Sequence, residues 1–150
     1  MDARTMKTVL LAEDSEDDIF VMKLACERAG IHHLLQVVTD GAMAIDYLSG
    51  NGTFTDRAVH PLPTVLFLDL KMPKCDGFEV LKWVRAQPHF LDLPVVMLTN
   101  SPLMEDINRA YQLGATSYLQ KNSDHAEFGQ AVRIILKYWL ELNMAPSLPE

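Results

Sequence analysis

The 150-residue sequence contains little cysteine and no long apolar run. Its two cysteines, Cys26 and Cys75, are far apart in the chain, which favours a reduced pair over a disulfide. No apolar stretch approaches the roughly 18 residues of a membrane-spanning helix. The N-terminal "MDARTMK" also lacks the apolar core of a signal peptide. These absences predict a cytoplasmic protein that does not contact a membrane.

Positive charge is also scarce, because 13 basic residues face 20 acidic ones and the net charge is −7. Binding to nucleic acid requires clustered Lys and Arg, so we expect no nucleic-acid partner. The five histidines do not have the spacing of zinc ligands.

The composition suits one globular domain, with 49% hydrophobic and 22% charged residues. A chain of this length usually forms a single compact unit. No internal repeat, low-complexity segment or linker interrupts it. We therefore expect one domain over residues 1–150, with its core at about residues 7–140, an extended C-terminal helix and no output domain.

Short apolar strands alternate with helices five times. The pattern predicts strands over residues 7–12, 34–40, 64–69, 93–99 and 116–121 and helices over residues 15–30, 40–50, 76–87, 101–114 and 124–143. Ser15, Asp40, Asp76 and Ser101 are the expected helix N-caps. Five such units predict an α/β fold with a doubly wound, five-stranded parallel sheet in the order 2-1-3-4-5, a flavodoxin-like arrangement.

Polar groups follow four of the expected strands at the edge where sites form in open α/β sheets. They are Glu13 and Asp14, Asp69, Thr99 and Lys121. Each has an ordinary alternative: the first two acids as helix caps, the threonine as a strand former and the lysine as a solvated charge. Asp69 is harder to explain in this way, because it ends a strand that reads as buried on both faces.

The chemistry of this set indicates phosphoryl transfer. Two carboxylates about 4 Å apart repel each other by roughly 4 kcal/mol at an effective dielectric near 20, so three of them require a cation. Oxygen ligands without His or Cys suit Mg²⁺. Lys121 and Thr99 can stabilise the oxygens of a transferring phosphoryl group, and Asp69 is the natural nucleophile.

With these residues the sequence resembles the receiver domain of two-component response regulators. The matching motifs are "ED" at 13–14, "DLKMPKCDG" at 69–77, Thr99 and Lys121, in that order. Pro73 and Gly77 stand where receivers usually carry Pro and Gly after the phosphoacceptor. The resemblance covers residues 7 to about 140.

The resemblance implies a role for each site residue. Asp69 would accept a phosphoryl group from a histidine kinase, and Thr99 and Lys121 would bind the phosphoryl oxygens. Tyr118 matches the aromatic switch position. The implied Mg²⁺ ligands are Asp14, Asp69 and the backbone carbonyl of Lys71, with Glu13 acting through water.

A narrower resemblance connects the chain to the stand-alone regulators that are paired with bacterial phytochromes. It rests on the loop "GNGTFTDRAVHPLP" at 50–63, the segment "DGFEVLKWVRAQP" and the terminal "YWL". It implies a bacteriophytochrome as the histidine kinase. Two positions depart from the receiver pattern: Asn122 follows Lys121 where receivers commonly have a cis proline, and Asn100 follows Thr99 where many have a smaller residue.

Three other functions compete with a phosphoacceptor that is not an enzyme. A pseudo-receiver would be a binding module that is never phosphorylated. An aspartate-nucleophile phosphatase would carry a second acid two residues after the nucleophile, where this chain has Lys71. A flavodoxin-like nucleotide-binding protein would need a Gly-rich phosphate loop after the first strand, which is missing here.

The last expected helix carries an apolar stripe at Phe128, Val132, Ile135, Trp139 and Leu142. Its first three positions should pack on the sheet. A helix of about 20 residues spans about 30 Å and a five-residue strand about 17 Å, so residues 138–142 should overhang the domain. We expect a homodimer through the fourth helix, the fifth strand and the fifth helix; folding of the overhang against the chain's own edge is the alternative.

Overall fold

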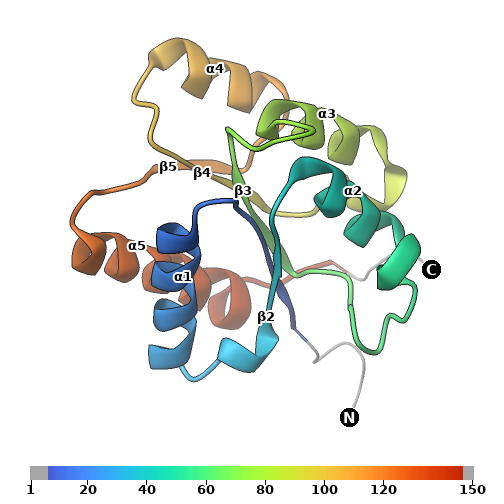
Figure 1. The fold of residues 1–150 in the computed structure, drawn as a ribbon, viewed down its shortest axis with the longest axis horizontal. Helices are drawn as coiled ribbons and strands as arrows, with labels where there is room; N and C mark the ends of the chain where they lie inside the picture. Colours follow the sequence, from blue (N-terminus) through green and yellow to red (C-terminus); the bar gives the residue numbers. More distant parts are fainter. Residues whose placement is uncertain (1–6, 147–150) are drawn as a thin grey trace.

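The computed structural model describes residues 7–146, and its centre is a five-stranded parallel sheet (Figure 1). The strands are β1 (Val9–Ala12), β2 (Leu35–Val38), β3 (Val65–Asp69), β4 (Val95–Thr99) and β5 (Ser117–Gln120). Their order, β2-β1-β3-β4-β5, confirms the predicted topology. The central strand β3 is buried along its whole length, as expected for a strand covered on both faces.

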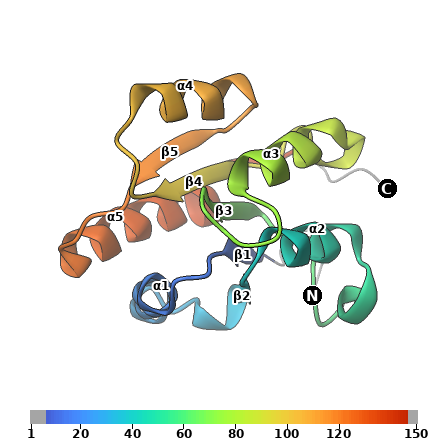
Figure 2. The same ribbon diagram turned by 45° about the horizontal axis from the view of Figure 1, so that its top comes forward.

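Within residues 7–146, five α-helices form the layers on the two faces of the sheet. They are α1 (Glu16–Arg28), α2 (Gly41–Ser49), α3 (Gly77–Ala86), α4 (Met104–Gln112) and α5 (His125–Lys137). Helices α1 and α5 cover one face of the sheet, and α2, α3 and α4 lie on the other (Figures 1 and 2). Within residues 7–146, no helix combines the length and apolarity needed to cross a bilayer.

Each layer encloses its own apolar core. Leu10, Leu66 and Met97 face α2, α3 and α4, whereas their neighbours Phe67 and Val96 face α1 and α5. Successive side chains of a strand point to opposite faces, so a strand between two cores must be apolar at every position. This requirement explains the continuous apolar runs in the sequence.

Side-chain caps define where four of the helices begin. Ser15, Asp40 and Asp76 accept backbone N–H bonds as predicted, and Asp124 caps α5. The prediction for Ser101 is wrong, because α4 begins at Met104 after Leu103. The Leu103 backbone is extended (φ −71°, ψ 127°), so the helix can begin only after it. The Ser101 hydroxyl instead donates to Asp106 (2.6 Å) and accepts from the Leu103 N–H (3.3 Å).

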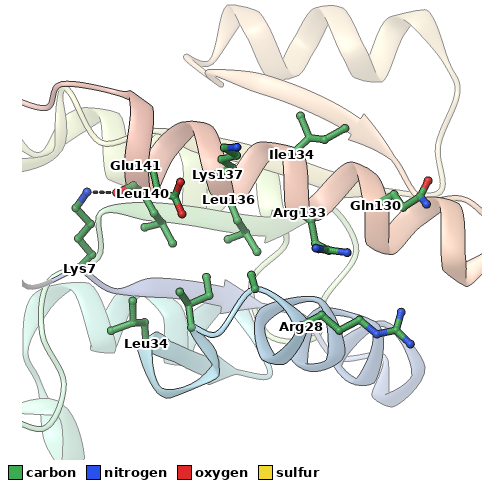
Figure 3. A pocket seen from close by; sticks show the side chains of 12 residues that line it. Lys7, Arg28, Leu34, Gln130, Arg133, Ile134, Leu136, Lys137, Leu140 and Glu141 are labelled. Atoms are coloured by element: carbon green, nitrogen blue, oxygen red, sulfur yellow. Dashed lines mark hydrogen bonds between the residues drawn. The ribbon is translucent and has the colours of Figure 1, made fainter.

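The end of α5 folds back on the domain more closely than the sequence predicted. A π-helical turn, Tyr138–Leu142, continues the helix, and Leu136 and Leu140 are buried. Figure 3 shows both pointing toward Leu34 across a groove of about 700 Å³, and the Lys7 ammonium donates to the Leu140 carbonyl.

The predicted stripe is therefore wrong at its end. Steps of four residues from Phe128 keep Val132, Leu136 and Leu140 on the buried face, whereas Leu142 is 62% exposed. Trp139 is half-buried against the same core.

The turn between β3 and α3 is closely packed around the end of β3. The Gly77 N–H donates to the Leu70 carbonyl (2.8 Å), and a Cβ atom at Gly77 would lie 2.3 Å from the Asp69 carbonyl oxygen. Only glycine fits this contact without a shift of the backbone. The close approach fixes where the chain leaves β3, and with it the position of Asp69.

Candidate functional site

The predicted site residues meet at the carboxyl edge of the sheet. Glu13 and Asp14 follow β1 directly, Asp69 and Thr99 end β3 and β4, and Lys121 follows β5. Parallel pairing sets Asp69 opposite Leu98 and Thr99 opposite Gln120, so these strands end at nearly the same level. Strand register therefore converts their separation in sequence into proximity in space.

Three carboxylates form the acidic part of the site. One oxygen from each of Glu13, Asp14 and Asp69 lies within 4.8 Å of the other two. Glu13 and Asp69 are buried, and Asp14 is exposed. A set of oxygen donors open to water on one side is the coordination that a hard divalent cation prefers.

The Lys121 ammonium lies among carboxylates. Its Nζ atom is 2.8 Å from Glu13 Oε2, 2.8 Å from Asp18 Oδ2 and 3.4 Å from Asp69 Oδ1. Burial alone would lower the pKa of Lys121, but hydrogen bonds to Asp18 and Glu13 and the Asp69 charge outweigh it and raise the pKa. The ammonium is therefore firmly protonated.

Negative charge exceeds positive charge at this edge. Burial raises the pKa of Glu13 to about 7, with the Lys121 hydrogen bond acting against the rise and the Asp69 charge adding to it. Burial also raises the pKa of Asp69, and Lys121 again opposes the change. One ammonium does not balance four carboxylates, including that of Asp18. The residues therefore fit a bound divalent cation, which would supply the missing positive charge.

Thr99 and Tyr118 connect the site to the start of α4. Thr99 is buried, its hydroxyl accepts the Ser101 N–H (3.1 Å), and its carbonyl accepts the Lys121 N–H (2.7 Å). The half-buried Tyr118 donates its hydroxyl to the Ser101 carbonyl (2.9 Å). A displacement of Thr99 would therefore also move Ser101, whose carbonyl accepts the Tyr118 hydroxyl.

The two departures from the receiver pattern lie beside Lys121. Asn122 accepts the Asp124 N–H (2.8 Å) and donates to Glu127 (2.7 Å), so its side chain orders the loop before α5. No peptide bond within residues 7–146 is cis. Asn100 is exposed and lines a cavity of about 560 Å³ together with Asp18 and Lys121. Lys71 lies in the exposed turn after Asp69, and the role of its carbonyl stays a prediction.

Asp18 is the site residue that sequence reasoning missed. Asp18 lies in the first turn of α1, where its N–H is bonded to the capping Ser15 (3.4 Å). The structure places its carboxylate on Lys121. The signal was its position in the first turn of the helix that directly follows the Glu13–Asp14 pair.

Known proteins share both the sequence pattern and the fold. The family model described as "Response regulator receiver domain" matches residues 9–133. The response regulator Rcp1 of Synechocystis sp. is 33% identical over 141 residues, which cover 94% of each chain.

Solved structures agree with this match. The phosphorylated cyanobacterial phytochrome response regulator RcpA superposes with a TM-score of 0.87 at 32% identity, covering 94% of this chain and 99% of that one. The Mn²⁺-bound form of Rcp1 gives 0.84 at 33% identity, with 94% and 99% covered. The bacteriophytochrome response regulator RtBRR gives 0.72 at 36% identity, with 95% and 82% covered.

The family match thus extends from β1 into α5 and includes every strand of the sheet. The carboxylates, threonine and lysine that it contains are the groups that meet at the carboxyl edge. The chain belongs to the response regulator receiver domain family of two-component signalling.

Proposed function

We propose that this receiver domain accepts a phosphoryl group on Asp69 from a phosphorylated histidine kinase. In the transfer, the P–N bond of the phosphohistidine breaks, a P–O bond to an Asp69 carboxylate oxygen forms, and the imidazole departs. The observation that supports this most directly is the contact between Lys121 and Asp69. The Lys121 Nζ atom lies 3.4 Å from Asp69 Oδ1, and Asp69 belongs to the acidic cluster. A buried carboxylate beside a fixed ammonium is suited to nucleophilic attack on phosphorus.

Mg²⁺ is the cation that we assign to the acidic cluster. Asp14, Asp69 and the Lys71 carbonyl would hold it, with Glu13 acting through water. When bound, it neutralises charge on the phosphoryl oxygens. The oxygen-only donor set supports this choice, and the relative Rcp1 has been solved with Mn²⁺. The direct contact between Glu13 and Lys121 suits a glutamate that does not contact the metal itself.

The remaining residues hold and report the phosphoryl group. Lys121 and Thr99 bind its oxygens, and Tyr118 changes position when Thr99 moves toward them. The Tyr118 bond to the Ser101 carbonyl, two residues after Thr99, supports this coupling. The acid that an aspartate-nucleophile phosphatase would need is replaced by Lys71, so we assign a signalling role rather than enzymatic turnover.

The kinase that we propose is a phytochrome. RcpA is a phytochrome response regulator and RtBRR a bacteriophytochrome response regulator. Their structures superpose on 94% and 95% of the present chain. The long loop 50–63, held by Arg57 bonds to the Tyr47, Leu48 and His60 carbonyls, is part of the sequence pattern that suggested this class.

Acetyl phosphate with Mg²⁺ should add one phosphoryl mass to the wild type and none to Asp69→Asn, because the amide is no nucleophile for phosphorus. Intact-protein mass spectrometry measures this directly. Asp46→Asn, at an exposed position on α2, is the matched control and should be labelled like the wild type. Equal labelling of Asp69→Asn and the wild type would refute the assignment.

Mg²⁺ should raise the melting temperature of the wild type, because a ligand that binds only the folded state stabilises it by about 2.7 kcal/mol at 100 times its Kd. Asp14→Asn should lose most of this rise. Glu16→Gln removes an exposed charge two residues away and should keep it. The same Mg²⁺ response in Asp14→Asn as in the wild type would contradict the proposed ligand set.

We also propose that the protein forms a homodimer through α4, β5 and α5. Apolar side chains are exposed on both helices of this surface, with Met104 at 63%, Tyr111 at 48% and Ile134 at 72%. A dimer would cover these side chains, and a two-fold pair is the commonest oligomer.

Ile134→Glu should shift sedimentation of the protein toward the monomer, because it buries a charge in the proposed interface. Phe20→Glu, at a 64% exposed position on α1, is the control and should sediment like the wild type. The dimer proposal is wrong if wild type is monomeric at high micromolar concentration both with and without a phosphoryl mimic.

A further inference from the structure

The Lys121 ammonium has a partner that the receiver motif does not contain, the Asp18 carboxylate in the first turn of α1. Lys121 Nζ is 2.8 Å from Asp18 Oδ2. This equals its distance to Glu13 Oε2 and is shorter than its 3.4 Å distance to Asp69 Oδ1. Three carboxylates lie within 3.4 Å of this ammonium, which has three N–H donors. These three carboxylates would compete with a phosphoryl group for the ammonium.

A phosphoryl group on Asp69 would have to draw the ammonium away from one of these carboxylates. Glu13 is poorly placed to release it, because its residue is 1% exposed and an unpaired charge there would remain buried. Its other carboxylate oxygen also accepts the Ser15 N–H at 3.1 Å.

Asp18 is better placed to release Lys121. Its side chain is 19% exposed. It lines the cavity of about 560 Å³ together with Asn100 and His125. Water in this cavity can solvate the Asp18 carboxylate once the ammonium has left, so its release does not create a dry, unpaired charge.

We propose that Asp18 is a positioning residue that holds Lys121 toward α1 in the unphosphorylated protein and releases it to the phosphoryl group on Asp69. This inference rests on the proposed function, in which Asp69 is phosphorylated and Lys121 binds the phosphoryl oxygens. A contact made only in the unphosphorylated state favours that state. Asp18 thus weakens phosphoryl binding and links the site to α1.

Beryllofluoride, a phosphoryl mimic, tests the proposal in the full-length chain with Mg²⁺ present. Asp18→Asn keeps the shape of the side chain but loses its charge, and should lower the Kd for beryllofluoride about tenfold, equivalent to about 1.4 kcal/mol. Asp17→Asn makes the same charge change in the same helical turn at an exposed residue. It should stay within about twofold of the wild type.

The side-chain ¹³C resonance of Asp18 supplies a second measurement that a merely structural role would not affect. In the wild type it should move, on addition of beryllofluoride, toward its position in unliganded Lys121→Gln, where the ammonium is missing.

An unchanged or raised Kd for Asp18→Asn, or an Asp18 resonance that stays in place when beryllofluoride binds, would overturn the role of Asp18 alone. Failure of the wild type to bind beryllofluoride at all would overturn the proposed function together with this inference.

Discussion

The site depends on one buried ammonium. Lys121 lies 3.4 Å or less from Glu13 and Asp18, around the start of α1, and from Asp69 at the end of β3. Without this cation, carboxylates at the ends of β1 and β3 would repel each other in a partly dry environment. Burial raises the pKa values of Glu13 and Asp69, and Lys121 opposes the rise without cancelling it. One ammonium among these carboxylates leaves the site short of positive charge. A receiver uses this deficit, because a site short of positive charge binds a divalent cation.

Packing of the apolar sheet fixes the strand ends that carry the polar groups. Every position of β3 and β4 is buried, so the strands that present Asp69 and Thr99 are fixed by packing on both faces. The close contact between Gly77 and the Asp69 carbonyl then sets the turn beyond β3. The polar groups lie only at the strand ends, where loops can adjust to a phosphoryl group without disturbing the core.

The sequence predicted what depends on periodicity and strand order. Five apolar runs were enough for the sheet topology, and their last residues for the convergence of Asp69, Thr99 and Lys121. It did not predict features that depend on three-dimensional packing. The start of α4 followed the extended backbone of Leu103 rather than the capping preference of Ser101. Similarly, the burial of Leu140 depended on a groove whose opposite wall comes from the segment after α1, far away in sequence.

Urea unfolding of wild type and Lys121→Met, with and without Mg²⁺, tests the charge balance at the centre of this account most directly. We expect Lys121→Met to lose about 3 kcal/mol of unfolding free energy without metal, because buried carboxylates lose their partner. Saturating Mg²⁺ should reduce this difference by restoring positive charge at the same edge. Equal free energies of unfolding for the two proteins, or a difference that Mg²⁺ leaves unchanged, would contradict the account.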